Sequence, residues 1–424
     1  MRQILKKILA ILARRVIIRY QPVVIGITGS VGKSTTKEAI FGVLSKRWKV
    51  LRNKENFNQE IGVPLAILDI EPFYKNGNTI ANKIKFVGQI LSRFWLAFGW
   101  PRGSYPKYLV LELAADRPGD IKYLTQIARP TIGVVTAVGE IPVHVEFYAG
   151  PKEVALEKSF LVRNLPSDGL AVLNNDDMAV MEMKHTTRAQ IVSFGFSDKA
   201  DIWASDVSYF IDESGKNIGG LSFNIHKSEF HCPMRLNRTI APHQIYGVLA
   251  ATAVGTHLGL SLAEISDSLE NIEMPTGRMT LKKGIKSSII IDDSYNASPA
   301  AMRAALETLK KFGDSVIGLN DRKGRKIAVL GDMKELGKYE IEAHKQTGEI
   351  AAKNADIIVT VGSAGKFIAE TASILMKPEN IMSFSTSEEA ASKVKELIQE
   401  GDIVLVKGSH SMKMEVVVKE IALN

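Results

Sequence analysis

The sequence predicts an α/β protein in which a central P-loop domain is followed by a Rossmann-like C-terminal domain. Two observations predict this fold. A short apolar strand, a glycine-rich turn and an amphipathic helix follow one another at residues 22–44, and from residue 288 strands and helices alternate to the end of the chain. Because parallel strands need a crossover connection, usually a helix, such alternation is typical of parallel sheets. We expect an N-terminal helix at 1–21, a central domain at 22–274 and a C-terminal domain at 279–424.

The composition is ordinary for a soluble globular protein and narrows the classes of partner. The 424 residues suffice for two or three domains, with 45% hydrophobic and 24% charged residues. A single cysteine, Cys232, excludes a disulfide framework and a multi-cysteine zinc site, and fits a reducing cytoplasm. The net charge of +8 favours anionic ligands such as nucleotides or anionic lipids. We find no basic tract with interleaved aromatic residues, which argues against nucleic acid.

The stretch GITGSVGKSTT at residues 26–36 is the feature around which the central domain is organised. A buried strand at 22–25 precedes it and a helix at 36–44 follows it. Glycines let backbone N–H groups approach phosphate oxygens, and the helix N-terminus adds its positive end. In such a P-loop, Lys33 bridges the outer phosphates and the Ser34 hydroxyl binds Mg²⁺. The flanking strand and helix make a chance glycine-rich turn the weaker interpretation.

The N-terminal stretch predicts a basic amphipathic helix. Its apolar core at 8–13 is too short to span a bilayer, and it ends at Arg14-Arg15, where a signal peptide would carry small residues for cleavage. One helical face gathers the large apolar residues Ile4, Leu5, Ile8, Leu9 and Leu12. The opposite face gathers the basic residues Lys6, Lys7 and Arg14. Either this helix docks on the domain that follows or it contacts a membrane, and the pattern leaves both open.

An apolar insertion occupies residues 72–105 of the central domain. Packed core or a partner interface is the more common use of such a segment. Its tryptophans and its flanking Lys83, Lys85 and Arg93 keep a membrane-interface position open. The large apolar residues are Ile84, Phe86, Val87, Ile90, Leu91, Phe94, Trp95, Leu96, Phe98 and Trp100.

Polar side chains follow several predicted strands of the central domain. Glu112 ends the strand at 108–113, and a carboxylate at such a position beside a P-loop commonly serves Mg²⁺. The loop at 56–65 opens with polar amides and either enters a site or caps a helix. His144 lies in a loop beyond the next strand. Lys158, in a predicted helix, has by itself the pattern of a helix-surface lysine.

The rest of the chain divides into β-hairpins, a linker and the second α/β unit. Residues 200–240 predict hairpins, an alanine-rich helix follows at 244–258, and Met274-Pro275-Thr276-Gly277-Arg278 has the composition of a linker. The C-terminal strands are expected at 289–293, 326–332, 356–362 and 402–409. Helices are expected between them, at 300–312 and through His344 to 352.

Taken in order, these motifs resemble those of the Mur ligases over residues 24–418. The resemblance is strongest to the branch that joins D-alanyl-D-alanine to a UDP-N-acetylmuramoyl-tripeptide. Besides Glu112, and His144 placed fourteen residues before Lys158, the matching segments are TGSVGKST from Thr28, NFNQEIGVPL from Asn56, PTGR from Pro275, DDSYNASPAAM from Asp292, VLGDMKELG from Val329 and LVKGSHSMKME from Leu405. The first and last of these are the P-loop and the end of the Rossmann-like domain.

The resemblance implies an ATP-dependent, ADP-forming amide ligase of peptidoglycan biosynthesis. Such an enzyme transfers the γ-phosphoryl group of ATP to a carboxylate, and an amine then attacks the acyl phosphate. Because anions must be brought together, the site needs concentrated positive charge. The implied acceptor is the peptide carboxylate of a cell-wall precursor, nucleotide-linked or lipid-linked. The implied amine is an amino acid or D-Ala-D-Ala.

The resemblance also implies roles for individual residues. The catalytic residues are Lys33, Glu112, His144 and Lys158. Those that bind ATP are Gly29, Ser30, Gly32, Lys33, Ser34, Thr35, Arg278, Asp292, Tyr295 and Asn296. Those that bind the substrates are Asn56, Asn58, Lys407, Ser409 and His410. Two Mg²⁺ sites are implied, the first held by Ser34 and Glu112 and the second by Glu112, His144 and a carbamylated Lys158.

The sequence departs from the family pattern in three places. Ile27 stands where the general P-loop has glycine. Only about two dozen residues precede the P-loop, so the UDP-binding domain of the family is expected to be absent. His243-Gln244-Ile245-Tyr246-Gly247 replaces the family's His-Asn-x-x-Asn, which leaves the adenine contacts of those asparagines open.

Two rival functions remain beside this ligase. A folylpolyglutamate-synthase-like ligase also lacks the UDP-binding domain, although the C-terminal motifs match it less well. A non-catalytic partner protein that binds nucleotide as a switch is the other, but it would need no second metal site. We expect a cytoplasmic protein without a nucleic-acid partner. Peripheral membrane or partner-protein contact through residues 4–12 and 84–100 stays open.

Overall fold

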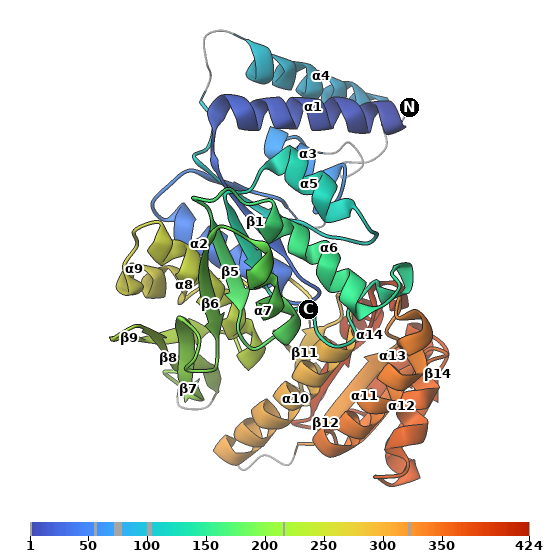
Figure 1. The fold of residues 1–424 in the computed structure, drawn as a ribbon. Helices are drawn as coiled ribbons and strands as arrows, with labels where there is room; N and C mark the ends of the chain where they lie inside the picture. The colour runs from blue at the N-terminus through green and yellow to red at the C-terminus, as the bar shows by residue number, and fades with distance from the viewer. Residues whose placement is uncertain are drawn as a thin grey trace.

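The computed structural model describes residues 2–54, 57–71, 79–99, 104–214, 217–320 and 324–423. Within them the chain forms two β-sheets, each flanked by helices, and the first sheet carries a helix pair, α1 (Arg2–Tyr20) and α4 (Ile80–Phe98), beyond one end (Figure 1). Both sheets are mostly parallel, so the predicted α/β class is confirmed.

The first sheet has nine strands in the order β2-β3-β1-β4-β5-β6-β7-β8-β9. Neighbours are parallel as far as β7, and β7, β8 and β9 form the predicted antiparallel hairpins. The strands are β1 (Val23–Thr28), β2 (Val50–Arg52), β3 (Tyr108–Glu112), β4 (Ile132–Val135), β5 (Leu170–Asn174), β6 (Gln190–Gly195), β7 (Ile202–Ile211), β8 (Ile218–Lys227) and β9 (Phe230–Asn237). Because β1 and β3 are adjacent, Ile27 pairs with Glu112 and the carboxyl ends of both strands meet.

Helices cover both faces of this sheet and bury two separate apolar cores. On one face lie α2 (Lys33–Ser45), α8 (Ile245–His257) and α9 (Leu262–Leu269). On the other lie α3 (Gly62–Leu68), α5 (Asp120–Ala128), α6 (Pro151–Arg163) and α7 (Met178–Met181). The arrangement fits strands that are apolar on both sides, as parallel strands usually are.

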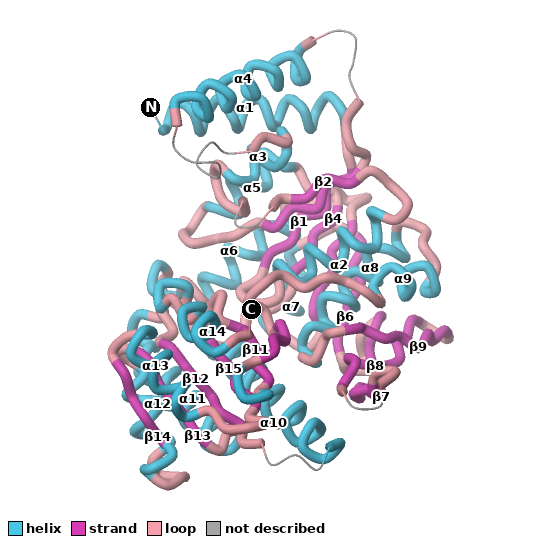
Figure 2. Tube along the Cα trace, turned by 180° about the vertical axis from the view of Figure 1, so that it is seen from behind, coloured by secondary structure: helices cyan, strands magenta, loops and turns pink. Residues whose placement is uncertain are grey.

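The second sheet has the order β10-β11-β15-β12-β13-β14, and only β10 is antiparallel to its neighbour. Figure 2 shows the parallel strands of this sheet, β11 to β15, with helices around them. Its strands are β10 (Thr280–Lys283), β11 (Ile289–Asp293), β12 (Lys326–Gly331), β13 (Ile357–Val361), β14 (Ile381–Phe384) and β15 (Ile403–Lys407). The helices α10 (Pro299–Asn320), α11 (Glu340–Asn354) and α12 (Gly365–Ala372) cover one face, and α13 (Ser387–Leu397) and α14 (Glu415–Ile421) cover the other. Short 3₁₀ turns are η2 (Val145–Phe147), η3 (Glu182–Thr186), η4 (Pro242–Gln244), η5 (Ile285–Ser287), η6 (Gly337–Tyr339), η7 (Pro378–Asn380) and η8 (His410–Met412).

The N-terminal helix α1 docks on the domain through a face that shares Leu9 and Leu12 with the predicted one. Its buried residues are Leu9, Leu12, Ala13, Val16 and Ile17, which pack into the core that α3 and α5 also enter. Ile4 and Ile8, which were expected on the buried face, are exposed. The reason is that α1 carries apolar residues around most of its circumference, so spacing alone does not single out one face. Its neighbours decide which set is buried.

The insertion at 72–105 is mainly the helix α4, and residues 72–78 and 100–103, Trp100 among them, lie outside the described residues. Among the side chains of α4 whose burial the structure describes, only Phe86 and Ala97 are buried, while Ile90 and Leu96 are partly buried against the core. Of the alternatives left open for this segment, packed core therefore fails for most of the helix, and contact with a partner protein or a membrane stays open. Among the helices that the structure describes, none combines the length and hydrophobicity that a bilayer crossing requires.

Candidate active site

The phosphate cradle is built where β1 runs into α2. The strand continues to Thr28, and α2 already begins at Lys33, three residues before the predicted start. Gly29 and Gly32 have φ angles of 149° and 85°, which favour glycine. A Cβ atom on Gly29 would lie 2.0 Å from Thr136 Oγ1, so no larger residue fits there. The loop is thus held close to the first turn of α2, whose free N–H groups suit an anion.

Lys33 folds back over this loop. Its Nζ donates to the carbonyl oxygens of Gly29 at 2.9 Å and Ser30 at 3.3 Å. Burial lowers the pKa of Lys33, and the positive charge of Arg278 lowers it further, while nearby carboxylates oppose both. In the described part of the chain no hydrogen-bond partner reaches the buried Ser30 Oγ. An incoming phosphate oxygen would satisfy this hydroxyl and stabilise the charged lysine.

Glu112 lies beside the loop, and both oxygens of its carboxylate are hydrogen-bonded. Ser34 Oγ donates to Oε2 over 2.8 Å, and Asn58 Nδ2 donates to Oε1 over 3.0 Å. Burial by itself would raise the pKa of Glu112, but Lys33 and other nearby cations, together with the Asn58 hydrogen bond, outweigh it and lower the pKa. The carboxylate is therefore ionised at neutral pH. Such adjacent hydroxyl and carboxylate oxygens are the hard ligands that Mg²⁺ prefers.

Asn53 and Thr136 position this site and were missed from the sequence. The fully buried Asn53 accepts from the backbone N–H of Glu112 and donates to its carbonyl oxygen, both at 2.9 Å. The Thr136 hydroxyl donates to the carbonyl oxygens of Val31 at 2.6 Å and Thr28 at 3.2 Å. Each residue directly follows a strand, β2 or β4, and that position is the signal that could have found them.

Lys158 is fully buried in α6, with 1% of its surface exposed, so its interpretation as a helix-surface lysine is wrong. Burial lowers the pKa of Lys158 to about 7, and Lys33 lowers it too, against the carboxylates of Asp116 and Glu157. Glu157 is itself held by two N–H groups at the start of α5, each at 2.8 Å. The lowered pKa makes the uncharged, nucleophilic amine of Lys158 accessible near neutral pH.

His144 lies between two carboxylates that were missed from the sequence. It has a φ of 65°, its Nδ1 lies 2.6 Å from Glu335 Oε2, and its Nε2 lies 3.5 Å from Asp116 Oδ1. Hydrogen bonding to His144 lowers the pKa of Glu335. Across the described ranges no group of three or more His, Cys, Asp or Glu side chains is arranged to hold a metal ion. The role of His144 as a metal ligand with Glu112 therefore stays a prediction.

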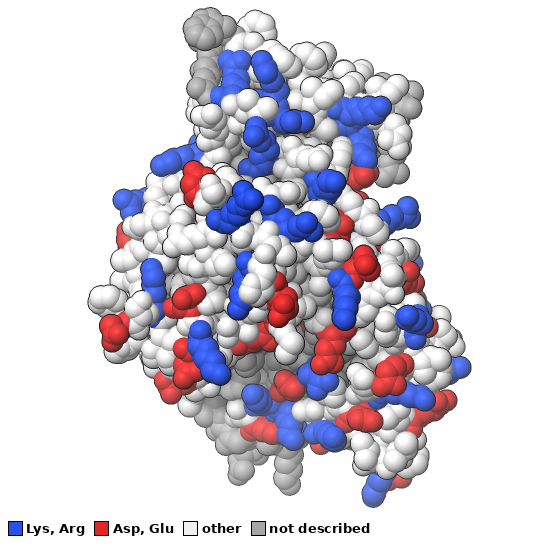
Figure 3. All heavy atoms as spheres, viewed as in Figure 1, with Lys and Arg blue, Asp and Glu red and all other residues white. Residues whose placement is uncertain are grey.

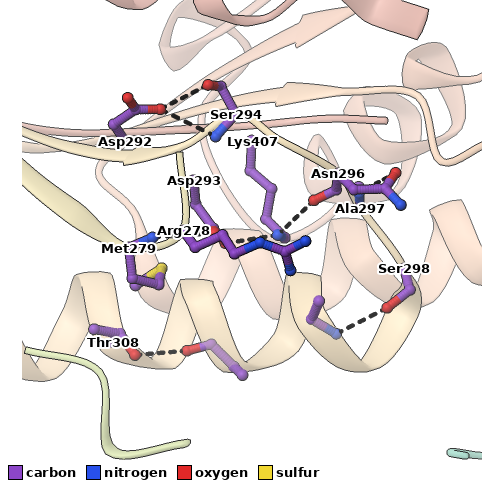
Figure 4. Close-up of polar contacts among 12 residues, drawn as sticks. Arg278, Met279, Asp292, Asp293, Ser294, Asn296, Ala297, Ser298, Thr308 and Lys407 are labelled. Atoms are coloured by element: carbon purple, nitrogen blue, oxygen red, sulfur yellow. Dashed lines mark hydrogen bonds and ion pairs between the residues drawn. The ribbon is translucent and has the colours of Figure 1, made fainter. Parts of the chain in front are cut away.

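The C-terminal sheet adds a buried ion pair. Lys407 Nζ lies 2.6 Å from Asp293 Oδ2 and donates to the Asn296 carbonyl oxygen over 2.9 Å. Burial raises the pKa of Asp293, although Lys407 and Arg278 act in the opposite direction. Figure 4 shows Asp293, Lys407 and Arg278 converging below β11. The substrate-binding role predicted for Lys407 thus competes with a structural one.

Asp292, the neighbour that the sequence singled out, points to the other side of β11 (Figure 4). Its carboxylate lies 2.9 Å from Lys282 Nζ and accepts from Ser294 Oγ over 2.6 Å. Successive side chains of a strand alternate between its faces, which is why only one of the two aspartates can lie beside Arg278. The alternation by itself predicts that the two aspartates face opposite sides of β11, but not which side Arg278 occupies. The nucleotide contact of Asp292 stays a prediction.

Arg278 connects the linker to both units. Its guanidinium lies 4.2 Å from the centre of the Tyr295 ring, and its carbonyl oxygen accepts from Gln244 Nε2 over 3.2 Å. Its charge also lowers the pKa of Lys33 and of Glu112, which places it near the phosphate cradle. This position suits a group that meets the outer phosphate of a nucleotide.

The other predicted substrate residues are only partly placed. Ser409 Oγ accepts from the backbone N–H of Lys334 over 2.9 Å, and the exposed His410 has its ring 5.7 Å from that of Tyr295. Asn56 lies outside the described residues. The substrate roles of these residues stay predictions.

The departure at the alanine-rich helix has a packing consequence. A Cβ atom on Gly247 would lie 3.2 Å from both Thr35 Cγ2 and the Thr36 backbone nitrogen, so glycine lets α8 approach the first turn of α2. Tyr246 is anchored beside it, because its hydroxyl donates to Asp176 Oδ2 over 2.9 Å. Gly247 and Tyr246 therefore help to hold α8 against the first turn of α2, which borders the phosphate cradle.

Comparisons with known proteins find one family in both units. The Mur ligase middle domain matches residues 102–255, and the Mur ligase glutamate ligase domain matches residues 277–410. The chain is 28% identical over 399 residues to the UDP-N-acetylmuramoyl-tripeptide–D-alanyl-D-alanine ligase of Bacillus subtilis, covering 94% of this chain and 75% of that protein.

Solved structures agree with this finding. The MurF ligase of Thermotoga maritima in complex with ADP superposes with a TM-score of 0.77 at 26% identity, over 98% of this chain and 83% of that one. Folylpolyglutamate synthase of the same organism reaches a TM-score of 0.58 at 13% identity, over 97% of this chain and 92% of that one, which shows a shared fold alone.

Proposed function

Because the chain belongs to the Mur ligase family, we propose that it is an ATP-dependent, ADP-forming amide ligase that joins D-Ala-D-Ala to the peptide carboxylate of a cell-wall precursor. The observation that carries this proposal is the P-loop in which Lys33 and the Ser34–Glu112 pair meet at the ends of β1 and β3. It is supported by the solved relative that binds ADP.

The chemistry proceeds in two balanced steps. A carboxylate oxygen of the acceptor attacks the γ-phosphorus, the bond to the β-phosphate bridging oxygen breaks, and ADP leaves. The neutral amine of the dipeptide then attacks the acyl carbon, inorganic phosphate leaves, and the amine proton is lost to a base. Lys33 and Arg278 supply positive charge to the transferring phosphoryl group, which is where negative charge must be stabilised.

Magnesium is the metal that fits this donor set. Ser34 and Glu112 present hard oxygens 2.8 Å apart, and the lowered pKa of Glu112 keeps its carboxylate charged. Bound there, the ion would neutralise charge on the nucleotide phosphates. Asn58 holds the carboxylate of Glu112 in place for this role, and Asn53 fixes the backbone of the same residue.

We further propose that Lys158 is carbamylated and contributes to a second metal site. A carbamate forms when an uncharged lysine amine attacks CO₂ and loses a proton, which converts a cation into an anion. Burial supplies the uncharged amine by lowering the pKa of Lys158 to about 7. The resulting anion would be stabilised by Lys33, whose positive charge disfavours the protonated form of Lys158.

A non-catalytic nucleotide-binding partner protein is the second candidate. Nucleotide binding alone does not require a fully buried lysine beside the phosphate cradle, and burying its amine costs free energy. The buried Lys158 therefore favours the ligase over the scaffold. A folylpolyglutamate-synthase-like activity shares only the fold with the chain at the level of identity seen.

The deciding experiment is mass spectrometry of products from a panel of acceptors. UDP-linked, lipid-linked and free peptides are each incubated with ATP, Mg²⁺ and D-Ala-D-Ala, and the phosphate released is measured in parallel. We expect one acceptor class to gain the mass of the dipeptide with one phosphate released per product. ATP binding without turnover on every acceptor would favour the scaffold instead.

A further inference from the structure

The helix pair α1–α4 exposes a concentration of large apolar side chains. We name the exposed apolar side chains of the two helices the α1–α4 face. It consists of Ile4, Ile8, Ile11 and Ile18 of α1 with Ile84, Val87, Leu91, Phe94, Trp95 and Phe98 of α4. Single exposed apolar residues are normal on a soluble protein, but a contiguous patch of this kind marks an interaction site.

The two helices are fixed side by side, so their exposed sets are neighbours. Tyr20 donates its hydroxyl to the Leu96 carbonyl oxygen over 3.3 Å, and Arg19 donates to carbonyl oxygens at the end of α4. The guanidinium of Arg15, an exposed residue of α1, lies 5.4 Å from the centre of the Phe98 ring. Figures 1 and 2 show the two helices adjacent in opposite views.

The charge around this face has one sign. Neither helix contains an aspartate or glutamate. Of the basic side chains that the structure describes on the two helices, four are exposed along this face, namely Lys7, Arg14, Arg15 and Lys85. Two acidic side chains of the domain already pair with basic residues of these helices, because Glu60 pairs with Lys6 and Asp69 lies 4.0 Å from Arg93. In Figure 3 the part of the surface over α1 and α4 is blue and white, and red atoms gather lower down.

We propose that the α1–α4 face docks the protein on an anionic lipid bilayer, with both helices lying along the surface. An aromatic and aliphatic stripe flanked by basic side chains matches the acyl boundary and the phosphate headgroups of such a membrane. The opposite sides of α1 and α4 pack on the domain, which holds the helices lengthwise to the surface.

A second copy of the chain fits this face less well. In a two-fold dimer the same patch meets itself, so basic side chains would face basic side chains with no carboxylate from either helix to balance them. The proposal does not depend on the ligase chemistry, since it uses no residue of the candidate active site.

Flotation of the full chain with lipid vesicles tests the proposal. Vesicles of phosphatidylcholine with phosphatidylglycerol are compared with phosphatidylcholine alone. We expect the protein to float with the anionic vesicles and to stay behind with the neutral ones. Raising the salt from about 0.1 M to about 1 M shortens the screening length from roughly 10 Å to roughly 3 Å and should release a large share of it.

Two variants and a matched control locate the contact. Leu91→Glu with Trp95→Glu changes side chains that are 64% and 71% exposed, and should lower the bound fraction at least about tenfold. Lys7→Gln with Arg14→Gln should weaken binding roughly fivefold per charge. Phe230→Glu with Ile374→Glu, at positions 72% and 80% exposed elsewhere on the molecule, should bind like the unchanged protein.

Circular dichroism and ATP turnover on the same samples show whether the variants are folded, independently of vesicle binding. The proposal is overturned if the unchanged protein does not float with the anionic vesicles. It is equally overturned if the Leu91/Trp95 variant floats as well as the control. Sedimentation without lipid that shows a dimer, abolished by Leu91→Glu with Trp95→Glu, would assign the face to a second copy.

Discussion

Two regions of the protein depart in opposite ways from the usual pattern of apolar side chains inside and charged side chains outside. They are the site at the carboxyl ends of β1 and β3, and the α1–α4 face. At the first, the ionisable side chains of Lys158 and Glu112 are buried and that of Lys33 is half-buried. At the second, large apolar side chains such as Leu91 and Trp95 are exposed. Each arrangement is unfavourable for the isolated chain, because buried charges lose hydration and exposed apolar surface orders water. Each therefore indicates a ligand of complementary chemistry, a nucleotide in one case and a lipid surface in the other.

The largest effect is expected where buried charge meets the transferring phosphoryl group. Lys33→Ala should lower turnover by roughly 10³-fold or more, since it removes a cation aimed at developing negative charge. Lys46→Ala, an exposed lysine at the end of the same helix, should leave turnover unchanged. Steady-state phosphate release measures both. A folded Lys33→Ala protein with near-normal turnover would contradict the P-loop assignment.

The second effect concerns Lys158 and CO₂. Lys158→Met should lower turnover by roughly 10²-fold, and short carboxylates added to Lys158→Ala should restore part of it. The unchanged enzyme should slow when bicarbonate is depleted and should gain activity between pH 6 and 8, as the amine with its pKa of about 7 loses its proton. Lys152→Ala, at an exposed position of the same helix, is the control. Full activity of Lys158→Met would remove the carbamate from the mechanism.

The lowered pKa of Lys158 should also make the free energy of unfolding depend on pH in CO₂-free buffer. The pKa of Lys158 is about 7 in the folded protein and 10.5 for an ordinary solvated lysine, so the unfolded chain binds more protons between these values. The free energy of unfolding should therefore rise with pH over this window, and Lys158→Met should remove that part of the rise. Urea unfolding at pH 7 and pH 9.5 measures it. An equal pH dependence in both proteins would show that Lys158 is not buried with a lowered pKa.

A third comparison sets a buried ion pair against an exposed one. Asp293→Asn leaves Lys407 without its carboxylate and should cost about 3 kcal/mol of unfolding free energy, since the buried cation stays uncompensated. Glu420→Gln breaks an exposed pair with Lys395 and should change it by less than about 0.5 kcal/mol. Urea midpoints of the two variants give the contrast. Similar losses would mean that burial does not strengthen the Asp293 pair.

The smallest effect is expected at the α1–α4 face. Leu91→Glu with Trp95→Glu should change the free energy of unfolding by only about 0.5 kcal/mol per substitution, because the exposed positions have few neighbours to lose. Thermal unfolding without lipid measures this change. A loss of several kcal/mol would show that these side chains stabilise the fold, and would separate them from a docking role.

Prediction from the sequence succeeded where local pattern and chemistry coincide. The P-loop residues Gly29, Lys33 and Ser34 could be placed because the strand, turn and helix are contiguous in the chain. The α/β class and both sheets followed from the alternation of strands and helices. The position of Glu112 at the end of a strand beside the P-loop also needed no more than the order of elements.

Other residues of the site could not be found this way. Asp116 and Glu335 are more than two hundred residues apart, and only folding brings both to His144. Asp293 rather than Asp292 lies beside Arg278 because the register and twist of β11 decide which side each faces. No local signal distinguishes the two aspartates unless the orientation of the strand is known.

The sequence by itself determined the family, the α/β fold and the presence of a phosphate cradle, because glycine spacing and apolar periodicity act over a few neighbouring residues. The tertiary structure alone decided which groups are buried. Lys158 has the sequence pattern of a surface lysine, but in the structure it is a buried amine with a pKa of about 7. Ile4, Ile8 and most of the large apolar side chains of α4 are exposed instead of buried. Burial depends on what packs against a side chain, and those neighbours come from distant parts of the chain.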